Sequence, residues 1–207
     1  MKMKRLVDLI LILVISPLLV VIYPTIALAI FVTDGRPILF SQKRTGKESY
    51  IFTMYKFRTM DSYSDEGLHE EHYKKLAEDT IVEPSLNPSR PIRIENDFRI
   101  TRVGNFLRKT SLDELPNIIN VIKGQMSLVG PRPLVPYESK LYREYEKIRN
   151  SSIPGITGLA QVQGRTDLSL QERLYWDLEY INNRNLLLDL NILFKTVTSV
   201  FQKKGAT

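Results

Sequence analysis

The feature that most constrains this chain is an uncharged apolar segment near its N-terminus. Residues 9–32, LILILVISPLLVVIYPTIALAIFV, form a run of 24 residues without a charged side chain. As a helix, this segment would be about 36 Å long, whereas the hydrocarbon core of a bilayer is roughly 30 Å thick. A segment of this kind is either buried in a membrane or removed during export. The arrangement of this segment therefore decides where the rest of the chain lies.

A cleaved signal peptide is the first arrangement that fits. The segment follows a short basic stretch, and Ala27-Leu28-Ala29 matches the small-x-small pattern of a cleavage site. A mature chain beginning at Ile30 would then be secreted. Asp8, the length of the apolar run and the apolar residues that follow Ala29 all argue against this arrangement.

A straight spanning helix is the second arrangement, and the charges on its two flanks argue against it. Basic residues tend to remain on the cytoplasmic side of a membrane. Here they occur on both flanks: Lys2, Lys4 and Arg5 precede the segment, and Arg36, Lys43, Arg44 and Lys47 follow it. Both ends therefore favour the same side of the bilayer.

A re-entrant hairpin satisfies both flanks. Pro17 has no N–H and bends a helix, and the hydroxyl of Ser16 can satisfy a carbonyl that the proline leaves free. Pro24 offers a second bend. We therefore expect residues 1–35 to form a re-entrant helix–break–helix in one leaflet. Residues 36–207 would form a domain on the same face of the membrane.

Composition narrows the class of the remaining chain. Its 207 residues suffice for one domain, and the absence of cysteine excludes disulfides and thiolate metal sites. The net charge of +6 divides into +6 over residues 1–60, −5 over residues 61–100 and +5 over residues 101–207. Basic surfaces suit an anionic partner. The chain has neither a recognition-helix motif nor an aromatic platform, so we expect no nucleic-acid partner.

Local patterns predict an α+β, mostly helical fold. Two runs rich in aromatic and β-branched residues, 37–44 and 49–60, flank the turn-like TGKE and predict a small β-hairpin. Helical spacing or polar helix-forming composition predicts helices over 101–109, 115–123, 137–149, 169–181 and 186–203. Gly124 is expected to end the second of these. Residues 61–79 should be an acidic helix, and 80–96 and 153–165 should be loops. The apolar stripe of 186–203 suits either core packing or an interfacial amphipathic helix.

The stretch RKTSLDELPNII, residues 108–119, carries two adjacent carboxylates, Asp113 and Glu114. Ser111-x-x-Glu114 has the pattern of a capping box. Alternatively, Asp113 is the N-cap, which places Pro116 in a first turn that tolerates it. Either choice puts both carboxylates at a helix N-terminus, an environment that also suits a bound phosphate. A structural cap and a reactive centre both remain open on these residues alone.

A reactive centre would need positive charge around the carboxylates. A carboxylate can attack phosphorus and form an acyl phosphate, and a neighbouring carboxylate can hold a divalent cation. Because an anion must then attack an anion, nearby cations have to offset the repulsion. Arginine suits this role because it binds phosphate in bidentate geometry. The candidate residues of such a diphosphate pocket are Lys56, Arg58, Arg108, Arg132 and Arg165.

A long block of this sequence resembles a known family. TRVGNFLRKTSLDELPNIINVIKGQMSLVGPRP, with FSQKRTGK, MYKFRTM, PGITGLAQVQGR and the pair Ser16-Pro17, resembles the bacterial sugar transferase family. The members that the chain resembles are the small monotopic polyprenyl-phosphate phosphoglycosyl transferases. The resemblance covers nearly the whole chain except residues 61–96, which we expect to be a variable insert. Pro24 departs from the family pattern and leaves the second arm of the hairpin undefined.

The resemblance implies a specific reaction. Family members transfer a sugar-1-phosphate from a UDP-sugar to a polyprenyl phosphate and release UMP, through a covalent aspartyl intermediate and with Mg²⁺. Asp113 would be the nucleophile, and Glu114 together with Asp113 would hold the magnesium. Arg108, Arg132 and Arg165 would bind phosphate.

The resemblance also implies a place in the cell. The chain would be monotopic in the bacterial inner membrane, with its catalytic domain on the cytoplasmic face. It would act in exopolysaccharide, capsule or glycoconjugate synthesis, with downstream glycosyltransferases as potential partners. The alternative from a different class is a membrane-anchored, non-catalytic lipid-binding scaffold, in which the carboxylate pair is only a cap.

Overall fold

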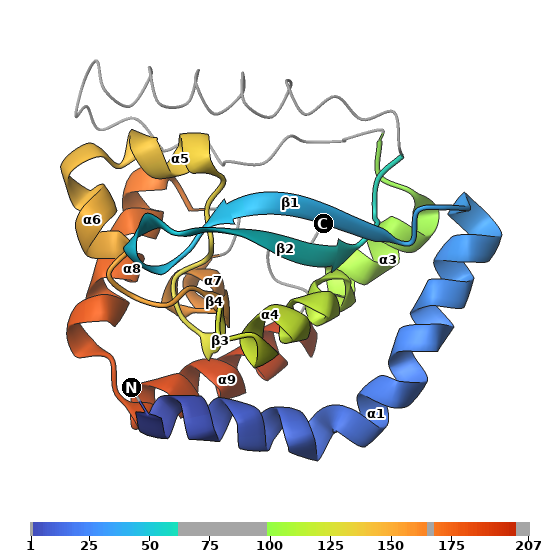
Figure 1. The fold of residues 1–207 in the computed structure, drawn as a ribbon, viewed down its shortest axis with the longest axis horizontal. Helices are drawn as coiled ribbons and strands as arrows, with labels where there is room; N and C mark the ends of the chain where they lie inside the picture. Colours follow the sequence, from blue (N-terminus) through green and yellow to red (C-terminus); the bar gives the residue numbers. More distant parts are fainter. Residues whose placement is uncertain (1, 62–98, 165–167, 202–207) are drawn as a thin grey trace.

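The computed structural model describes residues 2–61, 99–164 and 168–201, and these have a mostly helical α+β fold (Figure 1). In chain order, with η marking 3₁₀ helices, the elements are α1 (Lys2–Asp34), β1 (Leu39–Thr45), η1 (Lys47–Ser49), β2 (Ile51–Phe57), α3 (Arg102–Thr110), η2 (Leu112–Asn117), α4 (Ile118–Ile122), β3 (Ser127–Val129), α5 (Pro136–Leu141), η3 (Arg143–Tyr145), α6 (Glu146–Arg149), β4 (Gly155–Thr157), α7 (Leu159–Gln163), α8 (Leu170–Asn183) and α9 (Leu186–Phe201). The predicted helix over 61–79 and most of the expected insert lie outside the described residues.

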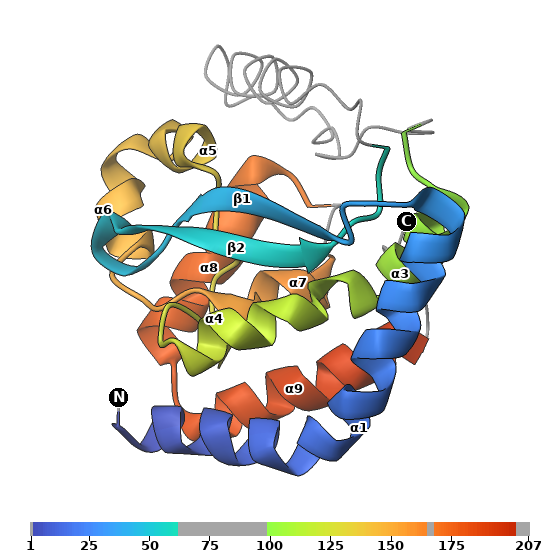
Figure 2. The ribbon, with the colours of Figure 1, turned by 45° about the vertical axis from the view of Figure 1, so that its right-hand side comes forward.

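The apolar segment is a single bent helix, α1. It runs along the lower edge of the molecule from the N-terminus and then turns upward (Figures 1 and 2). Pro17 cannot donate a hydrogen bond to the carbonyl of Leu13, and the hydroxyl of Ser16 donates to that oxygen instead at 2.8 Å. The role expected for Ser16 is therefore confirmed. The predicted break between two helices is corrected to a bend, because this substitute donor lets the helix continue through the proline.

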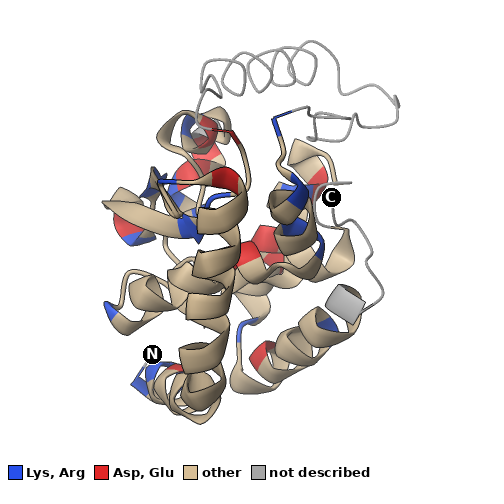
Figure 3. Cartoon of the chain, turned by 90° about the vertical axis from the view of Figure 1, so that its right-hand side faces the viewer, with Lys and Arg blue, Asp and Glu red and all other residues tan. Residues whose placement is uncertain are grey.

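Most of α1 offers an apolar surface. By length and composition, it is the one helix among the described residues that is apolar enough to cross a membrane. Leu13, Val20 and Val32 are each more than 70% exposed, although such side chains are normally buried in a water-soluble domain. Figure 3 shows that charged residues are absent from most of α1 and gather on the elements around it. An apolar environment is needed to cover this surface.

The predicted β-hairpin is confirmed. β1 and β2 pair in an antiparallel register that runs from Leu39↔Phe57 to Thr45↔Ile51. Because side chains alternate across a strand, Phe52, Met54 and Lys56 share one face of β2. Phe52 and Met54 are buried in the core on that face, so Lys56 is directed toward the interior as well. This register brings a lysine to the functional site.

Three apolar clusters hold the described elements together, and two of them include α1. Ile12 of α1 packs with β2 and α4, and Ile26 and Ile30 of α1 pack with β2 and α3. The third cluster joins β3, α8 and α9 through Val129, Tyr180, Ile181 and Ile192. Both halves of α1 are thus attached to the same body of elements.

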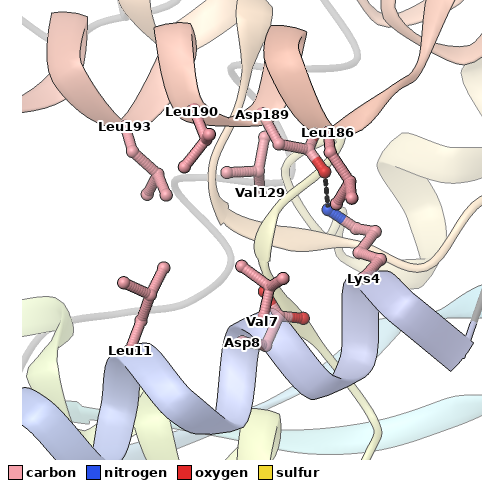
Figure 4. Close-up of a pocket in the computed structure, with 9 residues that line it drawn as sticks. All are labelled: Lys4, Val7, Asp8, Leu11, Val129, Leu186, Asp189, Leu190 and Leu193. Carbon is pink, nitrogen blue, oxygen red and sulfur yellow. Dashed lines mark hydrogen bonds and ion pairs between the residues drawn. The ribbon is translucent and has the colours of Figure 1, made fainter.

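Polar contacts reinforce the attachment at the start of α1. Lys4 forms an ion pair with Asp189 of α9 at 2.6 Å, and Asp8 accepts a hydrogen bond from the hydroxyl of Ser127 at 2.8 Å. Arg5 donates to the carbonyls of Val121 and Ile122 at the end of α4. Figure 4 shows the small cavity, about 70 Å³, that remains between α1 and α9 beside the Lys4–Asp189 pair. Six apolar residues and the charged Lys4, Asp8 and Asp189 line it.

The C-terminal half confirms some sequence predictions and corrects others. The helices expected over 101–109, 169–181 and 186–203 occur as α3, α8 and α9. The helix expected over 115–123 begins as η2 and is α-helical only in α4; it ends at Gly124, whose φ is +77°. Left-handed backbone at that position suits glycine, as expected for a C-cap.

Two further predictions were wrong. The single helix predicted over 137–149 is divided into α5, η3 and α6, because the N–H groups of Tyr142 and Tyr145 bond to carbonyls three residues earlier and tighten the chain. The loop predicted over 153–165 contains β4 and α7. β4 pairs in parallel with β3, and a Cβ at Gly155 would lie 2.1 Å from the nitrogen of Gly130. Gly130 and Gly155 therefore allow β3 and β4 to lie close together, and they do not mark a flexible loop.

Close packing at Gly104 provides a test of this fold. A Cβ on this α3 residue would lie 2.1 Å from the backbone oxygen of Thr59. Because backbone cannot move aside as a side chain can, we expect Gly104→Ala to lower the free energy of unfolding by about 2 kcal/mol. Thermal unfolding in detergent measures this. Asn105→Ala, on the exposed face of the same helix, is the matched control and should change stability little. Equal stability of the two variants would contradict this packing.

Candidate active site

The carboxylate pair lies in a 3₁₀ helix directly after α3. The N-cap residue of α3 is Thr101, whose hydroxyl accepts the N–H of Gly104, and its C-cap residue is Ser111, whose φ is +57°. This left-handed residue turns the chain into η2, which contains Asp113 and Glu114. Both carboxylates are in the first turn of η2, as predicted, and Ser111 is its N-cap residue. The side chain of Ser111, however, makes no capping hydrogen bond, and Asp113 is not a cap because it lies inside η2. The reason is that Ser111 closes α3, while Glu114 is directed toward cations from other segments.

Glu114 holds two cations on one oxygen. Its Oε1 accepts from Nζ of Lys56 at 2.7 Å and from Nη1 of Arg132 at 2.9 Å. Burial alone would disfavour the charged carboxylate, but Arg132 and Lys56 outweigh it and lower the pKa of Glu114 well below its ordinary value. Glu114 is therefore ionised at neutral pH, and it joins β2, η2 and the loop after β3.

At Asp113, the effects that raise the pKa outweigh those that lower it. It is 8% exposed, and its Oδ2 lies 3.6 Å from Nζ of Lys56. Burial raises the pKa of the Asp113 carboxyl, and the charge of Glu114 raises it further, while Lys56, Arg132 and Arg108 oppose both. The two neighbouring carboxylates thus differ in kind: Glu114 is paired with cations, whereas Asp113 is poorly solvated and less fully neutralised. Such a separation of pKa values is typical of catalytic pairs.

The predicted cations fall into three groups. Lys56 and Arg132 contact the pair directly, and Arg108, in the last turn of α3, acts on Asp113 through its charge. Arg58 instead donates to the carbonyls of Asp34, Gly35 and Arg36, so it closes the end of α1. Arg165 lies outside the described residues.

The donor set suits a magnesium ion bound mainly through substrate. No cluster of three or more metal-binding side chains occurs within residues 2–61, 99–164 and 168–201. Magnesium is, however, often held by one or two carboxylates together with substrate phosphates and water. Both cations on Glu114 contact Oε1, which leaves Oε2 without a hydrogen bond to the described residues. Asp113 and Glu114 therefore fit this mode of binding.

Comparison with known proteins identifies the family. Residues 1–203 match the family described as bacterial sugar transferase. The chain belongs to the bacterial sugar transferase family. The carboxylate pair and its cations are thus part of a bacterial sugar transferase, as the sequence resemblance predicts.

Several named bacterial sugar transferases are similar to this chain. An undecaprenyl-phosphate galactose phosphotransferase of Salmonella typhimurium is 44% identical over 173 residues, which cover 84% of this chain and 35% of that protein. The exopolysaccharide production protein ExoY of Rhizobium meliloti is 40% identical over 84% of this chain and 74% of its own length. A UDP-glucose:undecaprenyl-phosphate glucose-1-phosphate transferase of Klebsiella pneumoniae is 37% identical over 100% of this chain and 42% of that protein. The chain therefore spans less than half the length of two of these relatives.

Sequence reasoning missed three buried charged residues of this sugar transferase. Arg149, Arg173 and Asp177 are each less than 9% exposed, and the charge of Arg173 acts on Arg132. A signal was present in α8. Arg173 and Asp177 occupy the same helical stripe as the buried Tyr180 and Ile181, so charges stand at positions where apolar residues are expected.

The pairing of Glu114 predicts a pH-dependent stability. Its folded pKa lies below the ordinary 4.5, so the unfolded chain takes up the proton first as the pH falls through that value. The stability that ionised Glu114 contributes is therefore complete above about pH 5.5 and declines below about pH 4.5. In magnesium-free detergent, wild type should unfold at a higher temperature than Glu114→Gln at pH 7, and this difference should shrink toward pH 3.5.

The exposed Glu144→Gln is the control for this comparison. Its difference from wild type should stay small throughout. A difference between wild type and Glu114→Gln that is constant from pH 7 to 3.5 would contradict the ion-pair assignment.

Proposed function

We propose that this chain transfers a sugar-1-phosphate from a UDP-sugar to undecaprenyl or another polyprenyl phosphate and releases UMP. The observation that carries the proposal is the adjacent pair of the buried Asp113 and the partly buried Glu114, with Lys56 and Arg132 on Glu114. Its setting supports the proposal, because the chain is a bacterial sugar transferase and two relatives are named for sugar-phosphate transfer to undecaprenyl phosphate.

Asp113 is the proposed nucleophile. Its carboxylate attacks the phosphorus that carries the sugar, and the bond from that phosphorus to the UMP oxygen breaks, so UMP leaves with the electron pair. The phosphosugar remains on Asp113 as an acyl phosphate. An oxygen of the polyprenyl phosphate then attacks the same phosphorus, and the carboxylate of Asp113 is regenerated. Poor solvation of Asp113 favours this role because little water must be removed before attack.

The cations and Glu114 organise the substrate charge. Arg132 and Lys56 stand beside the carboxylates and offset the negative charge of an incoming diphosphate. Arg108 and Arg165 are proposed as further phosphate-binding residues. Glu114, with Asp113, is the proposed magnesium ligand, and Mg²⁺ when bound supplies positive charge to the phosphate oxygens. Arg58 is left out of this role because its hydrogen bonds close the end of α1.

The proposed topology is monotopic, with α1 re-entrant and the remaining chain on the cytoplasmic face of the bacterial inner membrane. Both ends of α1 contact the same body of elements: Lys4 binds Asp189 of α9, and Asp34 accepts from the hydroxyl of Thr101 at 2.9 Å. A helix that carried its two ends to opposite sides of a bilayer could not make both contacts. The bend in α1 and the basic flanks support the same arrangement.

Helix α9 is the proposed interfacial helix. Leu187, Leu190, Phe194 and Val197 are each at least half exposed, while Ile192 on its other side is buried. An apolar face beside an apolar membrane helix suits the boundary between headgroups and acyl chains. The membrane product, a polyprenyl diphosphate sugar, would then be used by glycosyltransferases that build exopolysaccharide or capsule.

The decisive variant is Asp113→Asn. We expect UMP release to fall by about three orders of magnitude or more, because an amide cannot act as the nucleophile. The assay offers UDP-galactose and UDP-glucose with undecaprenyl phosphate and Mg²⁺ to the membrane-bound chain and measures UMP. Chelation of the metal should stop turnover, and added Mg²⁺ should restore it.

Asp61→Asn makes the same chemical change at an exposed position and should leave turnover near wild type. Normal turnover by well-folded Asp113→Asn would overturn the covalent mechanism. If wild type released no UMP from any UDP-sugar, the membrane-anchored scaffold would become the better account.

The topology can be tested by labelling, because the chain contains no cysteine. Lys2→Cys and Lys47→Cys place single thiols at the start of α1 and after its end. Both should react with a membrane-impermeant maleimide in inverted inner-membrane vesicles, and both should be protected in intact spheroplasts. Labelling of the two positions from opposite sides would show a spanning helix instead, and loss of residue 2 from the mature chain would show signal cleavage.

A further inference from the structure

The loop that carries Arg132 is held at every carbonyl of residues 131–134. Four donors from three parts of the structure bond to these oxygens. The oxygen of Pro131 accepts from the N–H of Gly155 at 2.9 Å, that of Arg132 from Arg149 at 2.6 Å, that of Pro133 from Arg44 at 3.1 Å and that of Leu134 from the N–H of Thr45 at 2.8 Å. A loop fixed in this way presents its side chain in one direction.

Arg149, which donates to the carbonyl of Arg132, belongs to a buried ion pair. Arg149 of α6 uses Nη2 both for the carbonyl of Arg132 and for Oδ2 of Asp177, while its Nε donates to the same Oδ2 at 2.8 Å. The two side chains are 3% and 1% exposed, and the guanidinium lies 5.4 Å from the ring centre of Tyr142. This geometry fixes the guanidinium from three directions.

The contacts form one continuous chain into the candidate active site. Asp177 of α8 holds Arg149, Arg149 holds the backbone of Arg132, and the side chain of Arg132 reaches Glu114 at 2.9 Å. In these contacts, Asp177 and Arg149 do not touch Asp113 or Glu114. Their effect on the site therefore passes through the position of Arg132.

We propose that Arg149 and Asp177 are positioning residues, which set the place of Arg132 against Glu114 and thereby the alignment of a bound diphosphate. The inference rests on the proposed function for its effect on turnover, whereas its effect on the loop is independent of that function. A buried ion pair adds little net stability over apolar residues of similar size, so a precise geometric role is a physical reason for its presence here. Small misplacement of a substrate-aligning arginine costs as much as a hundredfold in rate.

The test replaces the ion pair by apolar side chains, Arg149→Met with Asp177→Leu, in the full-length chain in nanodiscs. This exchange removes both members of the pair together, so neither Arg149 nor Asp177 is left as a buried charge without the other, and the variant should fold. Hydrogen exchange should become faster in the peptide that covers residues 130–135 and remain unchanged in α3, which makes none of the hydrogen bonds to this loop. Lys47→Gln with Glu48→Gln removes a surface ion pair, at 2.9 Å, and is the matched control for both measurements.

A double-mutant cycle with Arg132→Ala separates positioning from general stability. With the better of UDP-galactose and UDP-glucose, the apolar pair should lower kcat/KM for UMP release by about tenfold to a hundredfold in wild type. In the Arg132→Ala background, the same exchange should change it by less than about twofold, because the residue to be positioned is already absent.

Three results would overturn the inference: unchanged exchange of residues 130–135, a folded apolar-pair variant with wild-type turnover, or equal rate losses in both backgrounds. If the apolar pair does not fold, Arg149→Lys takes its place under the same criteria, since lysine keeps the charge but cannot hold Asp177 and the Arg132 carbonyl together. Absence of UMP release by wild type with every UDP-sugar would refute the proposed function, yet the exchange measurement would still decide whether the pair holds the loop.

Discussion

The candidate site depends on one carboxylate oxygen that two cations share. Oε1 of Glu114 brings Lys56 from the β-hairpin and Arg132 from the loop after β3 to the same point. Without this anion, a lysine and an arginine would face each other in a poorly solvated place and repel. The hairpin, η2 and the loop are therefore placed relative to one another by electrostatics as much as by apolar packing. The neighbouring Asp113 lies beside this arrangement and receives only part of its positive charge, so the pKa values of the two adjacent carboxyls shift in opposite directions.

Much of this arrangement can be predicted from the sequence because it depends on local patterns. The hairpin follows from two aromatic, β-branched runs, and the bend at Pro17 follows from a missing N–H. The cations at positions 56 and 132 were found because carboxylates that act on a phosphate need them. The hairpin and the bend are encoded within a few residues of where they occur, whereas the two cations reach Glu114 from distant segments and could be predicted only from the chemistry of the site.

The remaining features depend on distant contacts, and local patterns did not reveal them. β4 can pair with β3 because Gly155 lies against Gly130. In the sequence, a short segment with three glycines looks like a loop instead. Ser111 is the N-cap residue of η2, yet its left-handed backbone also closes the preceding helix, and its side chain makes no capping hydrogen bond. Arg149 and Asp177 look like ordinary surface charges until α6 and α8 are packed together. Arg58 was assigned to phosphate by its charge, although its carbonyl partners come from the end of α1.

The attachment of α1 at both ends has a consequence for how a lipid substrate is found. In the proposed re-entrant topology, a domain tied to the two ends of one membrane-embedded helix cannot tilt or rise freely, so the proposed nucleophile Asp113 stays at a nearly constant height above the bilayer. A phosphate carried on a polyprenyl chain diffuses in that same plane. The encounter then becomes a search over an area instead of a volume, and the chain length of the lipid matters less than the depth of its headgroup.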